Sequence, residues 1–174
     1  ISTNQGYGYG VMAGLRVASG EVLSWTHADM QADPADVLAA FERFTVRLDM
    51  SSCFLKGRRI GRSFLDSIFT FGMSMLSSIA LGQALFDINA QPKMFHREFL
   101  KRMSHPPADF SLDLYALYIA RSSGCVILDQ PVRFGRRQHG AAKGGGTLKG
   151  KLNLIRRTWS YIHRLRRDLK EYEP

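Results

Sequence analysis

The stretch Glu21-Val22-Leu23-Ser24-Trp25-Thr26-His27-Ala28-Asp29-Met30-Gln31 decides the expected fold. Gly20 stops a helix just before it, and residues 21–26 are typical of a short, largely buried strand. Asp29 and Gln31 follow the carboxyl end of that strand. Open α/β sheets bind ligands at the carboxyl ends of their strands. A binding site is therefore expected at this position.

Helical patterns lie on both sides of this strand. A glycine-rich turn at residues 6–10 precedes apolar residues at helical spacing over residues 11–17. After the strand, Asp33 and Pro34 open a second helix as its N-cap and its first residue. The face that this helix turns to the core is expected to hold Val37, Leu38, Phe41 and Phe44.

The rest of the chain continues the alternation of strands and helices. Residues 46–55 contain a second strand, which is expected to end at Lys56-Gly57-Arg58-Arg59. A helix follows residues 109–113, residues 125–128 form another strand, and residues 131–134 form an edge segment. This alternation predicts an α/β layered domain over residues 1–145, followed by a helical tail over residues 146–174.

Residues 68–85 carry no charged side chain over 18 positions, so a membrane span has to be considered. The stretch also holds three serines, a threonine, a glutamine and two glycines, and Asp66 and Asp87 flank it. Helices that pack on the domain or lie at an interface are the preferred interpretation.

The net charge of +9 is concentrated at one end of the chain. Residues 1–130 hold 12 Lys and Arg against 12 Asp and Glu, whereas residues 131–174 hold 12 against 3. A basic helix there also carries an apolar stripe of Leu148, Leu152, Ile155, Trp159, Ile162, Leu165 and Leu169. This segment predicts an anionic partner, and composition leaves open a lipid surface, a phosphate-bearing substrate or nucleic acid.

Two cysteines, Cys53 and Cys125, are too few for a disulfide framework and are expected to be buried or half-buried thiols in a reducing cytoplasm. The polar opening at residues 1–5 does not resemble a signal peptide. Because no Met begins the chain and its first motif starts at residue 4, we expect a further segment upstream.

Asp29 and Gln31 are two residues apart, so both can reach one cation that prefers oxygen ligands. Mg²⁺ and Mn²⁺ are held by one or two carboxylates together with substrate phosphates, so one Asp with a helping Gln suffices for a metal that arrives with a diphosphate. Taken alone, an Asp after a strand is more often a helix cap than a metal ligand.

The order of motifs around Asp29 resembles that of family 2 glycosyltransferases, in particular the branch of dolichyl-phosphate mannosyltransferase and bacterial polyprenyl-phosphate enzymes. The matching residues are Asn4-Gln5-Gly6-Tyr7-Gly8, Gly14, Ala18-Ser19-Gly20-Glu21, Ala28-Asp29-Met30-Gln31 and Pro34. The resemblance implies a GT-A-type, Rossmann-like sheet, with metal ligands at Asp29 and Gln31 and nucleotide-sugar contacts from Asn4 and Gly6. His27 stands where the family has an Asp, and it could be a neutral ligand, a ribose contact or a pocket-lining residue.

Further matches follow in the family's order and extend the resemblance over residues 2–145. Lys56-Gly57-Arg58-Arg59 with Arg62 resembles a Gly-x-Arg segment, and residues 87–95 occupy the place of an Asp-Pro-x-Ser-Gly-Phe segment whose Ser-Gly is replaced. Residues 131–143 resemble a Pro-Val-x-Phe-x-x-Arg-x-x-Gly-x-Ser-Lys element, with Ala142 in place of Ser. Through it, Arg137 and Lys143 are implied to bind the nucleotide-sugar or the acceptor.

The implied activity is inverting transfer of a sugar from a UDP- or GDP-sugar to a polyprenyl phosphate or a membrane-associated glycan, with Mg²⁺ or Mn²⁺ as cofactor. Arg58 and Arg62 suit an acceptor phosphate, because arginine binds phosphate with two parallel hydrogen bonds. A hydroxyl acceptor would need a base, for which Asp113 is the candidate, and a helix cap is the alternative. The family's first strand, with its Pro-x-x-Asn-Glu region, has no counterpart in the sequence, so the donor is not readable.

We expect the enzyme at the cytoplasmic face of a membrane, held peripherally through the C-terminal helix, and a homo-oligomer is possible. One competing hypothesis is a non-catalytic module that binds nucleic acid or an anionic membrane through this helix. The stripe around Trp159 and the lack of an aromatic-bearing strand argue against nucleic acid. Another is a degenerate enzyme in which His27 marks lost metal binding, against which Asp29 and Gln31 argue.

Overall fold

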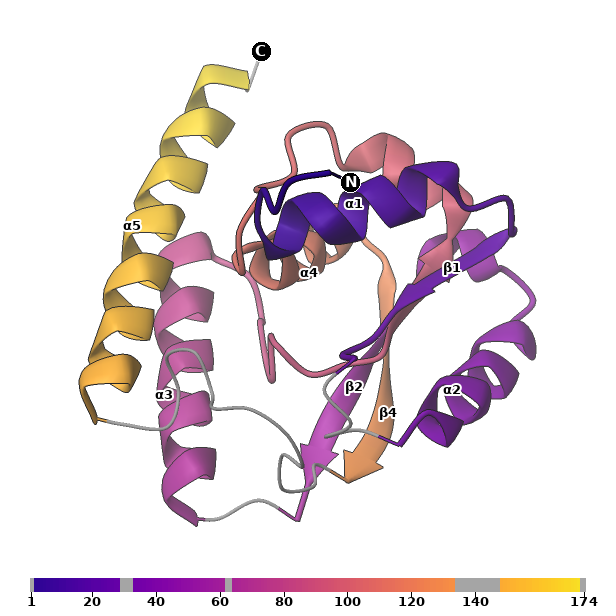
Figure 1. Ribbon diagram of the computed structural model, residues 1–174, viewed down its shortest axis with the longest axis horizontal. Coiled ribbons are helices and arrows are strands. Elements are labelled where there is room, and N and C mark those ends of the chain that lie inside the picture. The colour runs from indigo at the N-terminus through magenta and orange to yellow at the C-terminus, as the bar shows by residue number, and fades with distance from the viewer. Residues whose placement is uncertain (1, 29–32, 62–63, 134–147, 173–174) are drawn as a thin grey trace.

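A computed structural model describes residues 2–28, 33–61, 64–133 and 148–172 as a mixed α/β domain with helices around an open sheet (Figure 1). Its helices are α1 (Tyr7–Val17), α2 (Ala35–Thr45), α3 (Phe64–Leu81), α4 (Leu112–Ser122) and α5 (Leu148–Tyr172), with 3-10 turns at Met50–Ser52 and Arg97–Arg102. The strands are β1 (Val22–Trp25), β2 (Cys53–Ile60), β3 (Lys93–His96) and β4 (Val126–Arg133).

The four described strands form one sheet in the order β1-β3-β2-β4. β3 is antiparallel to both of its neighbours, with Leu23 and Phe54 each opposite Phe95, and β2 is parallel to β4 over the full length of both strands. β1, β2 and β4 therefore point the same way. Their carboxyl ends and the amino end of β3 lie at one edge of the sheet, which we call the carboxyl edge; Figure 1 shows the arrowheads of β2 and β4 there.

Apolar side chains pack on both faces of the sheet. The larger cluster joins α1, α4 and α5 to one face, with the stacked rings of Phe54 and Phe95 at its centre. A smaller cluster covers the other face and includes Ala40, Phe44 and Leu55. Cys125 belongs to the first cluster and Cys53 to the second, and both are free, buried thiols, as the sequence predicted.

The predicted start or end of several helices and strands is wrong. The glycine-rich segment expected to be a turn supplies the N-cap, Gly6, and the first turn of α1. Position 8 needs a glycine, because a Cβ there would lie 2.1 Å from the carbonyl oxygen of Pro107. β2 begins at Cys53 and contains Lys56-Gly57-Arg58-Arg59 rather than ending there. β4 absorbs the predicted edge segment up to Arg133, and it is indeed at the edge of the sheet.

The core-facing side of α2 also differs from the prediction. Ala40 and Phe44 are fully buried, whereas Leu38 is 67% exposed and Phe41 is 47% exposed. The small Ala40 allows the helix to lie close to the sheet, so it takes the place expected for the larger side chains. Asp33 does accept a hydrogen bond from the Ala35 amide at 2.9 Å, and the helix itself begins at Ala35.

The long helices α3 and α5 lie side by side at one end of the domain (Figure 1). Within the described residues, no helix is both long enough and apolar enough to cross a membrane. The predicted stripe of α5 is divided: Ile162 and Leu165 are buried in the larger core, while Leu152 is 58% exposed and Trp159 is 40% exposed. The predicted boundary near residue 145 falls outside the described residues.

Candidate functional site

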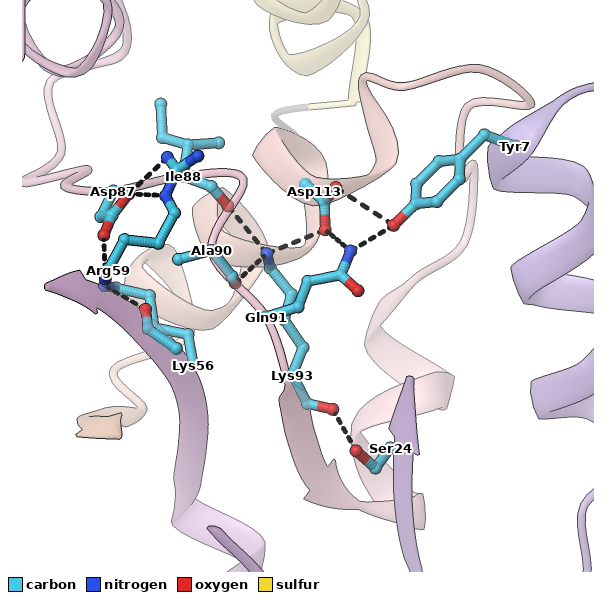
Figure 2. A network of polar contacts seen from close by, with 11 residues as sticks. Tyr7, Ser24, Lys56, Arg59, Asp87, Ile88, Ala90, Gln91, Lys93 and Asp113 are labelled. Atoms are coloured by element: carbon cyan, nitrogen blue, oxygen red, sulfur yellow. Dashed lines mark hydrogen bonds and ion pairs between the residues drawn. The ribbon is translucent and has the colours of Figure 1, made fainter. Parts of the chain in front are cut away.

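A network of four polar side chains lies at the carboxyl edge, between the sheet and the amino ends of α1 and α4 (Figure 2). Its members are Tyr7 from the start of α1, Gln91 from the loop before β3, Lys93 from the first position of β3, and Asp113 from the first turn of α4. We call this group the Lys93 network. It joins four segments that are far apart in the sequence.

The ammonium group of Lys93 is the centre of the network. Its Nζ lies 2.8 Å from Asp113 Oδ1, and it donates hydrogen bonds to the carbonyl oxygens of Ile88 at 2.7 Å and Ala90 at 3.1 Å. Nζ is also 5.8 Å from the centre of the Trp25 ring. The side chain is 0% exposed. A buried cation with one carboxylate and two carbonyl partners has its charge and its donors satisfied.

The Asp113 carboxylate also contacts the other two members of the network, Tyr7 and Gln91. Tyr7 donates its hydroxyl proton to Asp113 Oδ2 at 3.2 Å, and Gln91 Nε2 lies 3.4 Å from Oδ1 and 2.5 Å from the Tyr7 hydroxyl oxygen. The Asp113 side chain is 3% exposed. The predicted alternative, a cap on α4, is wrong: Ser111 precedes the helix, and Asp109 accepts the local hydrogen bond from the Ser111 amide.

Burial changes the acid–base properties of two members. Burial lowers the pKa of Lys93, and the neighbouring Asp113 carboxylate opposes that change. Burial and the charge of Asp113 raise the pKa of the Tyr7 hydroxyl well above its ordinary value. Tyr7 therefore keeps its proton at physiological pH and remains a hydrogen-bond donor to Asp113.

A second set of contacts fixes β2 to the loop before β3. Asp87 accepts hydrogen bonds from the Arg59 backbone amide at 2.6 Å and from Arg59 Nε at 2.7 Å. Gly57 donates its amide to the Pro92 carbonyl oxygen at 2.8 Å, and a Cβ at Gly57 would lie 2.3 Å from the Gln91 carbonyl oxygen. Asp87 thus holds the loop before β3 against β2 through hydrogen bonds. The same contacts place Gln91 beside Asp113.

Lys56 carries a further charge on this strand. Its Nζ lies 2.8 Å from Asp129 Oδ1 on the neighbouring strand β4, and its side chain is 4% exposed. The pair follows from the register, because Lys56 and Asp129 are opposite each other in the parallel β2–β4 ladder. It stabilises the sheet next to the Lys93 network.

Four other predicted site residues lie at or near the same edge. His27 is half-buried just after β1, with its ring centre 6.5 Å from that of Tyr7. Arg58 is exposed, and its neighbour Arg59 is the one held by Asp87. Asn4 Oδ1 accepts a hydrogen bond from the Gly6 amide at 3.0 Å, and Gly6 has a φ of 113°, which a side chain would disfavour.

Five predicted site residues lie outside the described residues: Asp29, Gln31, Arg62, Arg137 and Lys143. Among the residues that are described, no group of three or more His, Cys, Asp or Glu side chains is placed to hold a metal ion. The carboxylate nearest the centre of the carboxyl edge, Asp113, already has Lys93 as its counter-ion.

Sequence reasoning missed Tyr7, Gln91 and Lys93 as partners of Asp113. One signal was present: Lys93 begins the otherwise apolar run Met94-Phe95, where a lysine needs a specific partner if it is buried. The identity of that partner was hidden, because Asp113 belongs to a different helix. No protein-family model matches the chain, and no curated protein is similar to it in sequence.

Proposed function

We propose that the protein is a metal-dependent inverting glycosyltransferase that moves a sugar from a UDP- or GDP-sugar to a lipid-phosphate acceptor. The observation that carries the proposal is the direction of the strands. β1, β2 and β4 end at one edge, and residues 26–28 follow β1 there and lead in the sequence to Asp29 and Gln31. Ligands bind at the carboxyl ends of strands in open α/β sheets.

The metal ligands would be Asp29 and Gln31. Mg²⁺ and Mn²⁺ accept few protein ligands when a diphosphate supplies the others, so these two residues fit such a cation. When bound, the cation would neutralise charge on the departing nucleoside diphosphate. Asp113 does not compete for it, because its carboxylate is paired with Lys93 at 2.8 Å.

The chain's own residues favour a phosphate acceptor over a hydroxyl. A hydroxyl needs a general base within hydrogen-bond distance, and the Asp113 side chain is 3% exposed with both oxygens engaged. A lipid phosphate is already an anion and needs no base. Arg58 is exposed near the end of β2 and can bind its phosphate oxygens.

In this mechanism, Asp113 is a positioning residue rather than a catalytic one. Its ion pair with Lys93 fixes the loop carbonyls of Ile88 and Ala90, and its hydrogen bond with Tyr7 fixes the start of α1. The Tyr7 ring also lies near His27, with 6.5 Å between the ring centres. The reaction would take place at the cytoplasmic face of a membrane, where lipid-borne acceptors are found.

The test is release of nucleoside diphosphate by the full-length protein from a panel of UDP- and GDP-sugars, with a polyprenyl phosphate acceptor and Mn²⁺ or Mg²⁺. Asp29→Asn should abolish metal-dependent release while the far-UV circular dichroism spectrum stays unchanged. Asp33→Asn is the matched control, because Asp33 is an exposed carboxylate whose described role is to cap α2. Near-normal turnover of Asp29→Asn at saturating Mn²⁺ would refute the metal assignment.

A further inference from the structure

Helix α3 has a row of large apolar side chains on its outer side. Its exposed large apolar residues are spaced four, three, four and four positions apart, so they form one line along the helix. We call them the α3 stripe: Phe64 (78% exposed), Ile68 (52%), Phe71 (59%), Met75 (48%) and Ile79 (76%). A helix that faces water normally has its polar side chains there.

The inner side of α3 carries serines beside Ala80 and Leu81, which pack against the larger core. Ser74 is 2% exposed and Ser77 is 0% exposed. Ser74 Oγ accepts a hydrogen bond from the Asp87 amide at 3.2 Å, and Ser78 Oγ accepts one from the Leu85 amide at 2.9 Å. These bonds tie α3 to the loop that leads to β3. These hydrogen bonds hold the serines of α3 inward, and they therefore also fix the α3 stripe on the outer side of the helix.

A strongly basic helix lies next to the stripe-bearing helix. α5 packs beside α3 (Figure 1), and residues 148–172 contain eight Lys and Arg against two Asp and Glu. Arg156, Arg164 and Arg167 are exposed on α5. An outward apolar surface beside a cluster of cations matches the two layers of an anionic bilayer, an acyl boundary below charged headgroups.

We propose that the α3 stripe is a bilayer-binding face, with α3 lying flat in the interface of an anionic membrane and α5 supplying cations to the headgroups. This goes beyond the binding expected from α5 alone, and it does not depend on sugar transfer. The alternative occupant is a second copy of the chain. Pairing through α3 would bring two basic α5 helices together, which like charges disfavour.

The docking would place the bilayer next to the candidate site. α3 starts four residues after Ile60, the last residue of β2, so its amino end adjoins the carboxyl edge. The inward serines Ser74 and Ser78 hold the 85–87 loop, which carries Asp87 and leads to the carbonyl groups bound by Lys93. A membrane-bound α3 would therefore present the carboxyl edge to molecules in the headgroup layer.

The test is co-sedimentation of the full-length protein with two kinds of vesicle, pure phosphatidylcholine and phosphatidylcholine mixed with phosphatidylglycerol. We expect binding to the anionic vesicles that weakens with added salt. The variant Ile68→Ser/Phe71→Ser should lower this binding by at least about tenfold, because two apolar side chains no longer enter the acyl boundary. The control Leu38→Ser/Phe41→Ser removes two similarly exposed side chains from α2 and should bind as the parent does.

Two further measurements make the result decisive. Thermal unfolding must show that both double variants remain folded, and light scattering gives the oligomeric state of each. If either double variant fails to fold, an environment-sensitive dye on Met75→Cys replaces it, with Leu38→Cys as the control. A blue shift on anionic vesicles at position 75 alone supports the proposal. Unchanged binding of the α3 variant, or a dimer that only this variant dissociates, overturns it.

Discussion

Asp113→Asn isolates the contribution of the buried ion pair at the centre of the network. The substitution keeps the shape of the side chain but removes its charge, which leaves the ammonium of Lys93 without a counter-ion at 0% exposure. Losing one partner of a buried ion pair costs about 3–5 kcal/mol. Two carbonyl acceptors remain on Lys93 Nζ, from Ile88 and Ala90, so we expect a loss near the lower end, about 3 kcal/mol.

The pH dependence of this loss has a definite sign. In the variant, the carboxylate no longer opposes the effect of burial, so the pKa of Lys93 in the folded protein moves further below its ordinary value of 10.5. At a pH between the lowered pKa of folded Lys93 and its ordinary value of 10.5, Lys93 is protonated in the unfolded chain but not in the folded protein. Stability of the variant therefore rises with pH in this window. The deficit relative to the parent should be largest near neutral pH and should shrink as pH approaches 10.5.

Urea unfolding of parent and variant at about pH 7 and about pH 10 measures both effects. The control is Asp109→Asn, because Asp109 pairs with Arg157 at 3.7 Å with both side chains about half exposed, and such pairs contribute only about 0–1 kcal/mol. Adding Lys93→Met to Asp113→Asn should recover part of the lost stability, since no buried charge remains. A loss below about 1 kcal/mol, or one that grows with pH, would refute the reasoning.

Three other substitutions probe the same edge of the sheet. Gly57→Ala should lower the free energy of unfolding by about 2 kcal/mol in urea titrations, because its Cβ would lie 2.3 Å from the Gln91 carbonyl oxygen. An unchanged midpoint would show that the loop can move away. Arg58→Lys should leave stability within about 0.5 kcal/mol but reduce use of a lipid-phosphate acceptor in transfer assays, with donor hydrolysis unaffected. Equal loss of both activities would place Arg58 on the donor. Arg59→Lys should instead lower the melting temperature, because it loses its forked contact with Asp87.

The layered α/β architecture could be predicted because its signals are local. The strand over residues 21–26, the helix after Asp33 and the helix predicted after residues 109–113 each depend on periodicity and on neighbouring capping residues. The α1 boundary was missed for a tertiary reason. Gly8 and Gly10 weaken a helix by roughly 1 kcal/mol each, yet the Tyr9 amide bonds to Ala108 and Gly8 fits against the 107–109 backbone.

The candidate site was less predictable than the fold. Asp113 was selected from its place in a resemblance to known enzymes, but its pairing with Lys93 and Tyr7 depends on where α1, β3 and α4 meet in space. The faces of α2 and α3 show the same limit. The pattern of α2 predicted that Phe41 is buried, and the pattern of α3 did not show which side of the helix faces the core; only the packed arrangement shows which side chains lie inward.

The parallel pairing of β2 with β4 has a consequence for synthesis of the chain on the ribosome. β2 is complete at Ile60, and 65 residues, 61–125, are translated before β4 begins. During that interval the nascent chain carries an unpaired strand edge that includes Phe54 and Leu55. Such edges recruit other strands, so chaperone binding to the nascent protein is expected to be strongest before residue 126 emerges. Once β4 has docked, Pro131 lies in the new edge strand and lacks a backbone N–H for further pairing.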